Sequence, residues 1–218
     1  MHVDDFFAYH PIVRGAALAR FWGCLCLGMI SWHSAFAHRS APSLAVGNVS
    51  PPVFSIDVAR EREQLHRISI PISPSDPIIP GLVERMVQAM QINHGDGLAA
   101  VQVGEAVRLV LLKRGTDKES PLVLLNPRVV SSSDLRAGSW EFCLSVPWGY
   151  VYVERPKRLT VRYQTLRADT VDGDFEQGDA VILQQELDHL NGKLLSDVYP
   201  RSEFLSLEEL KNLINKPK

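Results

Sequence analysis

The sequence has few cysteines and no marked excess of either charge. Only Cys24, Cys26 and Cys143 occur among 218 residues, which are too few for a disulfide framework. A net charge of −2 excludes a general electrostatic attraction to nucleic acid or to an anionic membrane. A hydrophobic content of 45% excludes a wholly disordered chain, and the length fits one catalytic-size domain, alone or with an appendage. Cys143, which stands apart from the other two cysteines, is either a small core residue or a chemical group.

Acidic residues are absent from Phe6 to Ile56, where the charged side chains are those of Arg14, Arg20 and Arg39. Within this stretch Phe21–Ala37 carries no formal charge, and its 17 residues are at the short limit for a membrane span and comparable to a signal-peptide core. A segment that contains arginine and serine but no acid is also typical of an organellar transit peptide.

We therefore expect residues 1–50 to be a targeting or leader segment outside the fold, and residues 51–218 to form the folded domain. The expected location is the mitochondrion or another organelle. Secretion or membrane anchoring is the alternative, and the membrane would be contacted only through an uncleaved leader.

The remainder of the chain predicts an α+β fold. Apolar residues at helical spacing indicate a helix near 81–93. A second helix is expected over 179–190, with Asp179 as its N-cap and Asn191-Gly192 as its stop. A third should begin at Ser206, whose spacing from Glu209 fits a capping box. Short strands are expected at 108–112, 122–125, 151–153 and 159–166, and the Asp-Gly of residues 171–174 predicts a hairpin turn.

The helix expected over 179–190 carries polar residues on its apolar face. On a helical projection Gln185, Glu186 and His189 all lie within about 60° of Ile182. Burial of a carboxylate there requires a cation, a proton or a hydrogen-bond network. Taken alone, this pattern also fits a core His–Glu pair whose polar atoms are satisfied.

Two further stretches contain residues suited to chemistry. Gly95–Gln102 places two glycines, which permit close backbone approach, before a glutamine amide. Alone, it could be a helix stop followed by a packing contact. Glu141–Ser145 contains Cys143, which alone could be a buried structural thiol.

In this order the three stretches resemble the peptide deformylase family. Gly95–Gln102 matches that family's G-x-G-L-A-A-x-Q at every fixed position. Glu141–Ser145 matches E-G-C-L-S except for its glycine, and Gln184–Leu190 matches Q-H-E-x-D-H-L except for its first histidine. The resemblance covers about residues 55–205. It implies an α+β fold with short mixed or antiparallel sheets around a central metal-site helix.

The resemblance also implies a reaction, a cofactor and residue roles. The reaction is hydrolytic removal of the N-formyl group from the initiator methionine of nascent polypeptides, with N-formyl-methionyl peptides as substrates and the ribosome with its nascent chain as a possible partner. One divalent metal ion, Fe²⁺ or Zn²⁺, would be bound by Cys143 and His189, with Glu186 as general base and acid. No nucleic-acid site is implied.

The remaining carried-over positions concern the oxyanion and the peptide. Gln102 and the backbone N–H of Leu144 would stabilise the oxyanion. Gly97 and Leu98 would line the peptide groove.

Three positions depart from the family pattern. Gln185 stands where the first histidine of H-E-x-x-H is expected, and an amide oxygen is a weaker ligand for iron or zinc than imidazole. Phe142 replaces a glycine, and Tyr150 stands where arginine is common.

These departures leave three hypotheses. The first is an organellar deformylase whose metal site is completed by the Gln185 oxygen and water. The second is a catalytically impaired or inactive relative that binds peptides or the translation machinery. The third is metal-free thiol chemistry by Cys143 and His189.

Overall fold

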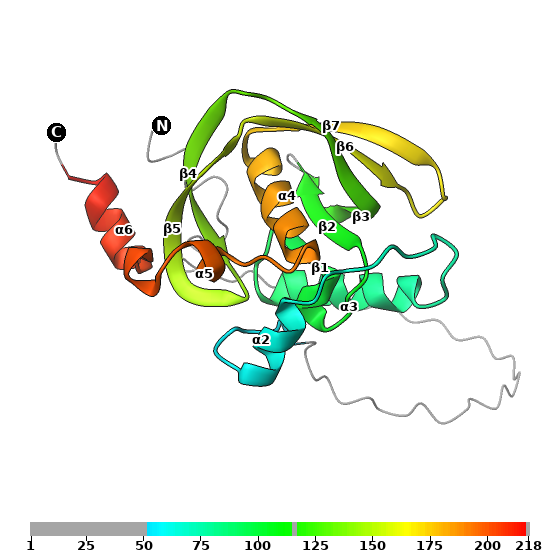
Figure 1. Ribbon diagram of the computed structural model, residues 1–218, viewed down its shortest axis with the longest axis horizontal. Helices are drawn as coiled ribbons and strands as arrows, with labels where there is room; N and C mark the ends of the chain where they lie inside the picture. The colour runs from blue at the N-terminus through cyan, green and yellow to red at the C-terminus, as the bar shows by residue number, and fades with distance from the viewer. Residues whose placement is uncertain (1–51, 115–116, 217–218) are drawn as a thin grey trace, which may run out of the picture.

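The computed structural model describes residues 52–114 and 117–216, so the expected leader, residues 1–50, lies outside the described residues (Figure 1). The helical segments are α2 (Ala59–Leu65), α3 (Ile79–Ile92), η2 (Ala100–Val103), α4 (Gln177–Leu190), α5 (Leu195–Val198), η3 (Arg201–Glu203) and α6 (Leu207–Ile214). The strands are β1 (Gly97–Ala99), β2 (Leu109–Arg114), β3 (Asp117–Ser132), β4 (Arg136–Cys143), β5 (Val146–Pro156), β6 (Arg158–Gln164) and β7 (Thr170–Glu176). None of the helices in these two ranges is long and apolar enough to cross a membrane.

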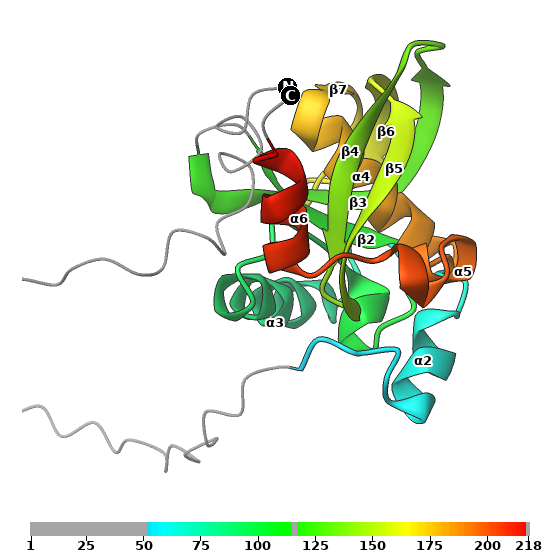
Figure 2. The same ribbon diagram turned by 90° about the vertical axis from the view of Figure 1, so that its left-hand side faces the viewer.

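The strands form two antiparallel sheets. Five strands pair in the order β1-β2-β3-β6-β7, and β4 pairs with β5 as a separate hairpin. Helix α4 lies between the hairpin and the larger sheet, and Figure 2 shows α6 beside the hairpin. The expected α+β class is therefore confirmed, and the central position of α4 brings both sheets within reach of its side chains.

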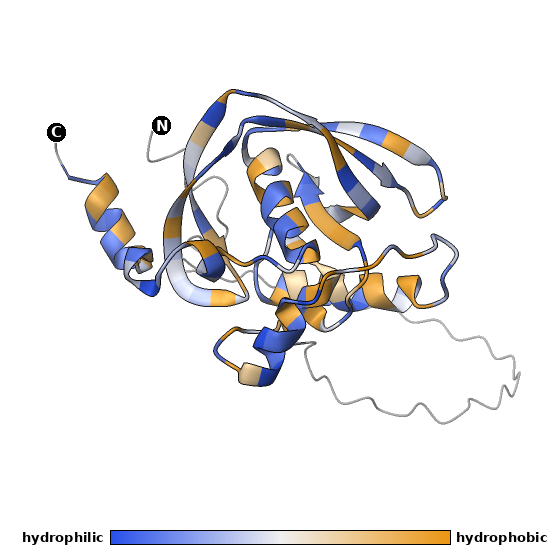
Figure 3. Cartoon of the chain, in the orientation of Figure 1, coloured by the Kyte–Doolittle hydropathy of each residue, from blue (hydrophilic) through white to orange (hydrophobic). Residues whose placement is uncertain are grey.

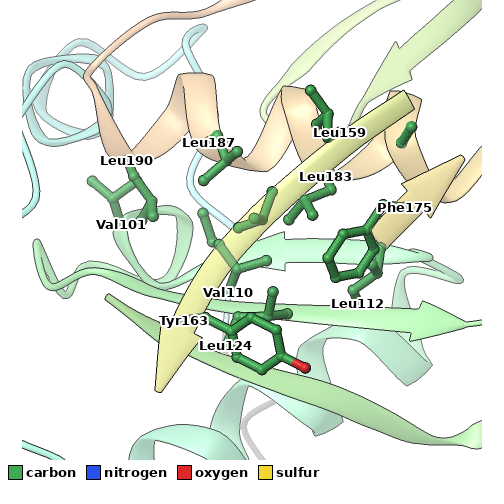
Figure 4. Packing of buried hydrophobic residues seen from close by; sticks show 13 residues of the cluster. Val101, Val110, Leu112, Leu124, Leu159, Tyr163, Phe175, Leu183, Leu187 and Leu190 are labelled. Atoms are coloured by element: carbon green, nitrogen blue, oxygen red, sulfur yellow. The ribbon is translucent and has the colours of Figure 1, made fainter. Parts of the chain in front are cut away.

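The larger sheet is covered by a helix on each face. Leu183, Leu187 and Leu190 project from α4 onto one face (Figure 4). Met86 and Met90 of α3 pack on the other. Strand β2 is buried on both sides because Val110 and Leu112 face α4 while Leu109 and Leu111 face α3, each with no exposed area. Two-sided burial explains why β2 reads as a continuous apolar run, visible as its orange stretch in Figure 3.

The β4–β5 hairpin is held by apolar contacts on both of its faces. Cys143, Val146, Val151 and Val153 join a cluster with residues that precede α3 and follow α4, namely Leu65, Leu194, Leu195 and Phe204. On the outer face, Tyr150 packs against Leu210 of α6. The end of β4, which carries Cys143, is thus fixed from two directions.

Several sequence predictions agree with these elements. The helix expected near 81–93 is α3, and Ser206 caps α6 through the predicted capping box, since its Oγ accepts from the Glu209 N–H at 3.2 Å. Gly192 follows α4 with φ of 69°, a left-handed conformation suited to glycine. Each of the four predicted strands overlaps an observed one, in β2, β3, β5 and β6.

Two local predictions are wrong. The Asp172-Gly173 pair does not form a turn. It lies within β7, where a Cβ on Gly173 would come within 3.1 Å of the Phe175 and Tyr163 rings, so the glycine provides space for aromatic packing. The chain instead reverses between β6 and β7, where Ala168 has φ of 66°. Asp179 is not the N-cap of α4, because the helix begins at Gln177, and Asp179 lies in its first turn, where a carboxylate interacts favourably with the helix dipole.

Candidate metal centre and cleft

Helix α4 and the end of β4 bring sulfur and imidazole together. Cys143 Sγ lies 3.2 Å from His189 Nε2, although the two residues are 46 positions apart in the chain. Each is only 1% exposed. The structure therefore places the two predicted metal ligands in direct contact with each other and almost fully buried.

Gln185 lies one helical turn before His189 and contacts a different residue of β4. Its Nε2 donates a hydrogen bond to Glu141 Oε2 at 3.0 Å. Glu141 also accepts two hydrogen bonds from Arg155, at 2.5 Å and 3.0 Å. Arg155 in turn reaches Asp188 Oδ2 at 2.9 Å, which links β5, β4 and α4. The pairing of Gln185 with Glu141 was not predicted from the sequence, although Glu141 belongs to the second motif and Arg155 to its flank.

Gln102 and Leu144 bring two further segments of the chain to the cavity that Gln185 also lines. Gln102, on η2, accepts a hydrogen bond from the Ala99 N–H at 2.8 Å and donates one to Ser145 Oγ at 3.1 Å. These two bonds fix a side chain that is 2% exposed. Leu144 directly follows Cys143, and both Gln102 and Leu144 line the cavity described next.

A cavity of about 880 Å³ opens beside these groups. Its polar residues include Gln102, Gln185 and Glu186. Apolar residues make up much of the remaining lining: Leu135, Trp140, Phe142, Leu144, Val181 and Ile182. The Trp140 and Phe142 rings themselves contact Tyr152 and Tyr150 of the paired strand. Apolar and polar residues thus line the cavity together, and Gln185 and Glu186 contribute polar lining from the helix that carries His189.

Neighbouring residues of strand β1 face opposite sides of the sheet, and only one of these sides borders the cavity. Gly97 lines it, whereas Leu98 has no exposed area and packs in the core on the α3 side. The Leu98 side chain therefore faces the core and not the cavity, and the assignment of Leu98 to the peptide groove stays a prediction. The physical reason is the alternation of a strand, which directs neighbouring residues to opposite faces.

Gly97 allows Glu186 to approach the backbone of β1. A Cβ at Gly97 would lie 2.7 Å from Glu186 Oε1 and 2.5 Å from Ile182 Cγ2. We therefore expect Gly97→Ala to displace the Glu186 carboxylate and to lower the free energy of unfolding by about 1–3 kcal/mol. Urea denaturation provides the measurement.

Gly81→Ala is the matched control for this substitution. No atom lies within 4 Å of a Cβ at Gly81, which is in α3. Alanine there should be neutral or stabilising. Equal stability of Gly97→Ala and the wild type would contradict the close packing of Glu186 on β1.

Burial controls the charge of the groups beneath the cleft. It raises the pKa of Cys143 to about 12, with a further contribution from the Glu186 charge, and it raises the pKa of Glu186 to about 8. Burial also lowers the pKa of His189 to about 4, with Arg155 acting in the same direction. The protein's own groups thus favour a neutral thiol, imidazole and carboxyl at neutral pH.

The donor set fits a divalent cation with one unusual member. Across the part of the chain that the structure describes, no group of three His, Cys, Asp or Glu side chains is arranged to hold a metal. Cys143 and His189 supply two donors of the kind that zinc and iron accept, and the Gln185 amide lies on the same helix face as His189. A cation would also stabilise the buried thiolate, whose formation is otherwise unfavourable.

Glu186 adds an acid–base group beside these donors. Its side chain is 3% exposed, and its Oε2 has no hydrogen-bond partner among the described residues. A buried carboxyl with an unused oxygen is suited to hold and transfer a proton. A thiol, an imidazole and a buried carboxyl gathered beside one cavity are the kinds of group that metal-dependent hydrolases use as ligands and as acid–base catalyst.

Comparison with known proteins identifies the family. The family model for polypeptide deformylase matches residues 56–204. The chain is 38% identical over 148 residues to the peptide deformylase of Caulobacter vibrioides, covering 66% of this chain and 85% of that protein. It is 40% identical over 135 residues to the enzyme of Bartonella henselae, covering 61% and 77%.

Solved structures agree with this assignment. Peptide deformylase from Thermotoga maritima aligns with a TM-score of 0.60 at 32% identity, covering 66% of this chain and 94% of that one. The class I type b enzyme from Acinetobacter baumannii, solved with Met-Ala-Ser bound, aligns with a TM-score of 0.62 at 29% identity, covering 69% and 99%. The chain belongs to the peptide deformylase family, whose members are hydrolases and metalloenzymes.

Proposed function

We propose that this protein removes the N-formyl group from the initiator methionine of nascent organellar polypeptides, with Fe²⁺ or Zn²⁺ held by Cys143, His189 and Gln185. The observation that carries the proposal is the contact of Cys143 Sγ with His189 Nε2, 3.2 Å apart, close to the buried Glu186, which lines the cavity. The match of this chain to peptide deformylases supports the substrate class.

The reaction adds water to the formyl carbon and breaks its bond to nitrogen, which releases formate and a free amino terminus. The divalent ion, when bound, supplies Lewis-acid polarisation and lowers the pKa of water at the site. Glu186, in its ionised form, takes a proton from the attacking water and passes it to the departing amine. A bound cation would favour that ionised form over the neutral carboxyl that burial alone favours. Gln102 and the Leu144 backbone N–H would donate hydrogen bonds to the developing oxyanion.

The lining of the cavity favours a substrate peptide that begins with methionine. The apolar part of this lining, which includes Leu144, Val181 and Ile182, can bury an unbranched apolar side chain. A solved relative from Acinetobacter baumannii was crystallised with Met-Ala-Ser. Gly97, at the edge of β1, also lines the cavity and would let the peptide backbone approach.

The test is release of formate from a formyl-methionyl tripeptide by protein supplied with excess Fe²⁺ or Ni²⁺ under anaerobic conditions. The acetyl-methionyl tripeptide serves as the control substrate. Metal-dependent formate release, without matching acetate release, is the expected result. Absence of formate at saturating metal would overturn the proposal.

The organellar location rests on the amino-terminal composition. Arginines and serines without acidic residues before Ile56 favour a transit peptide, and translation of bacterial type in an organelle would supply formylated nascent chains on the ribosome. A fusion of residues 1–50 to a fluorescent protein should localise to an organelle. Localisation to the secretory pathway or to the cell surface would support the alternative.

Peptide binding without turnover is a second candidate, favoured by two observations. Gln185 directs its amide nitrogen to Glu141. Neither Cys143 nor His189 is among the residues that line the cavity, so the walls that would contact a peptide are formed by other residues. Tight binding of formyl-methionyl peptide by metal-free protein that shows no turnover would support this candidate, and robust turnover would exclude it. Thiol catalysis is not favoured, because His189 Nδ1 has no orienting partner among the described residues.

A further inference from the structure

We infer that Glu141 is a positioning residue that holds the Gln185 amide with its carbonyl oxygen available to the Cys143–His189 pair as a third donor. The inference rests on the proposed function, because it assigns a ligand of the same site. It concerns the one position at which this chain departs from the H-E-x-x-H pattern.

The distance between Glu141 and Cys143 along β4 is similar to the distance between Gln185 and His189 along α4. Glu141 and Cys143 are two residues apart on a strand and therefore face the same side, separated by about 6.6 Å. Gln185 and His189 are four residues apart on a helix, about 6 Å along its axis, and share a face. Two parallel contacts result, Glu141 with Gln185 and Cys143 with His189. The amide thus lies one step along the same interface from the sulfur–imidazole contact.

The chemistry of Glu141 fixes the orientation of the amide. An ionised carboxylate can only accept hydrogen bonds, so it binds the NH₂ end of Gln185 and leaves the oxygen directed elsewhere. That oxygen accepts no hydrogen bond from the residues that the structure describes. An amide without this partner could present either end to the site.

Glu141 is itself held in place. Its side chain is 3% exposed, and the Arg155 guanidinium binds both of its oxygens. Arg155 also binds Asp188 on α4, which keeps the helix and the hairpin in register. Rotation of the carboxylate away from Gln185 would break these bonds of a side chain that is almost fully buried, at a substantial cost in free energy.

The first test examines the amide without any metal. In ¹⁵N-labelled protein, the side-chain NH₂ pair of Gln185 is assigned by its disappearance in Gln185→Met. We expect slow hydrogen exchange and a downfield proton, both altered in Glu141→Gln, where a neutral amide no longer selects one end of Gln185. Shifts and exchange typical of an exposed glutamine would overturn the inference.

The second test measures Co²⁺ binding through the thiolate-to-cobalt absorption band. Gln185→Met should weaken Co²⁺ binding by about 10-fold or more, because the volume is kept while the oxygen is removed. Glu141→Gln should weaken it by a smaller factor. Gln184→Met is the matched control, because the Gln184 side chain donates hydrogen bonds to Ala180 O and Pro156 O and not to Glu141. The Co²⁺ affinity of the Gln184→Met protein should stay within about 3-fold of that of the wild type.

The outcomes separate the inference from the proposed function. Equal Co²⁺ affinity of wild type and Gln185→Met, with binding lost in Cys143→Ser, would overturn the role of Gln185 while the metal centre stands. Absence of Co²⁺ binding by the wild type would instead overturn the metallohydrolase proposal itself. A Gln184→Met effect as large as that of Gln185→Met would also count against the inference.

Discussion

A Gln185→His variant is expected to bind Fe²⁺ or Co²⁺ about 100-fold more tightly than the wild type and to release formate faster. Imidazole is a much stronger donor to these ions than a neutral amide oxygen, and loss of a direct ligand should exceed the roughly 10–100-fold cost of losing a supporting residue. The surroundings of residue 185 already contain a hydrogen-bond acceptor for a histidine ring. The Glu141 carboxylate, which now accepts from the Gln185 amide at 3.0 Å, could accept from one ring N–H and orient the other nitrogen.

The measurements are metal content after dialysis, the Co²⁺ dissociation constant, and kcat/KM for a formyl-methionyl tripeptide. Gln184→His is the control, because it adds an imidazole to α4 at a residue whose side chain bonds to Ala180 O and Pro156 O, away from Glu141. It should give no gain in affinity or turnover. If Gln185→His also gave no gain, Gln185 would not be the limiting departure, and Phe142, which lines the cavity next to Cys143, would be the next candidate.

The long helices and the centre of the sheet were predictable because local pattern and burial agree there. Helix α3 has one apolar face, α6 has a capping box, and β2 is a run of apolar residues between two helices. Strand β4 was not predicted, since residues 136–142 are mostly half-buried and show no clear alternation. Its Gly138, which reads as a strand breaker, instead gives room to the Tyr152 ring on the paired strand.

The site was partly predictable for the same physical reason. Glu186 and His189 occupy the apolar face of their helix, and the structure shows both buried. The Gln185–Glu141 bond could not be read from the sequence, because it depends on how closely β4 approaches α4 and on Arg155, contributed by a third element. The direction of the Leu98 side chain could not be judged from the sequence, because a three-residue strand is too short to show an alternation of apolar and polar residues.

Glu186→Gln should lower kcat for formate release by about 100- to 10,000-fold, the range expected when a positioned general base and acid is lost. The amide has the shape of the carboxyl but cannot take a proton from water or return one to the leaving amine. Cys143, His189 and Gln185 are unchanged, so Co²⁺ affinity and KM should stay within about 3-fold of the parent. The variant should also be at least as stable to urea, because a side chain that is 3% exposed no longer carries a group able to ionise.

The experiment is best done in the wild type and again in the Gln185→His background, where higher metal occupancy widens the measurable range. Glu176→Gln is the control: this carboxylate also lines the cavity, but it is 64% exposed and pairs with Arg158 at 3.3 Å. Its kcat should remain within about 3-fold of the parent, because an exposed ion pair contributes little. A Glu186→Gln protein that keeps its turnover while binding metal normally would show that another group moves the proton. The buried carboxyl beside Gly97 would then serve the packing of α4 against β1 instead of catalysis.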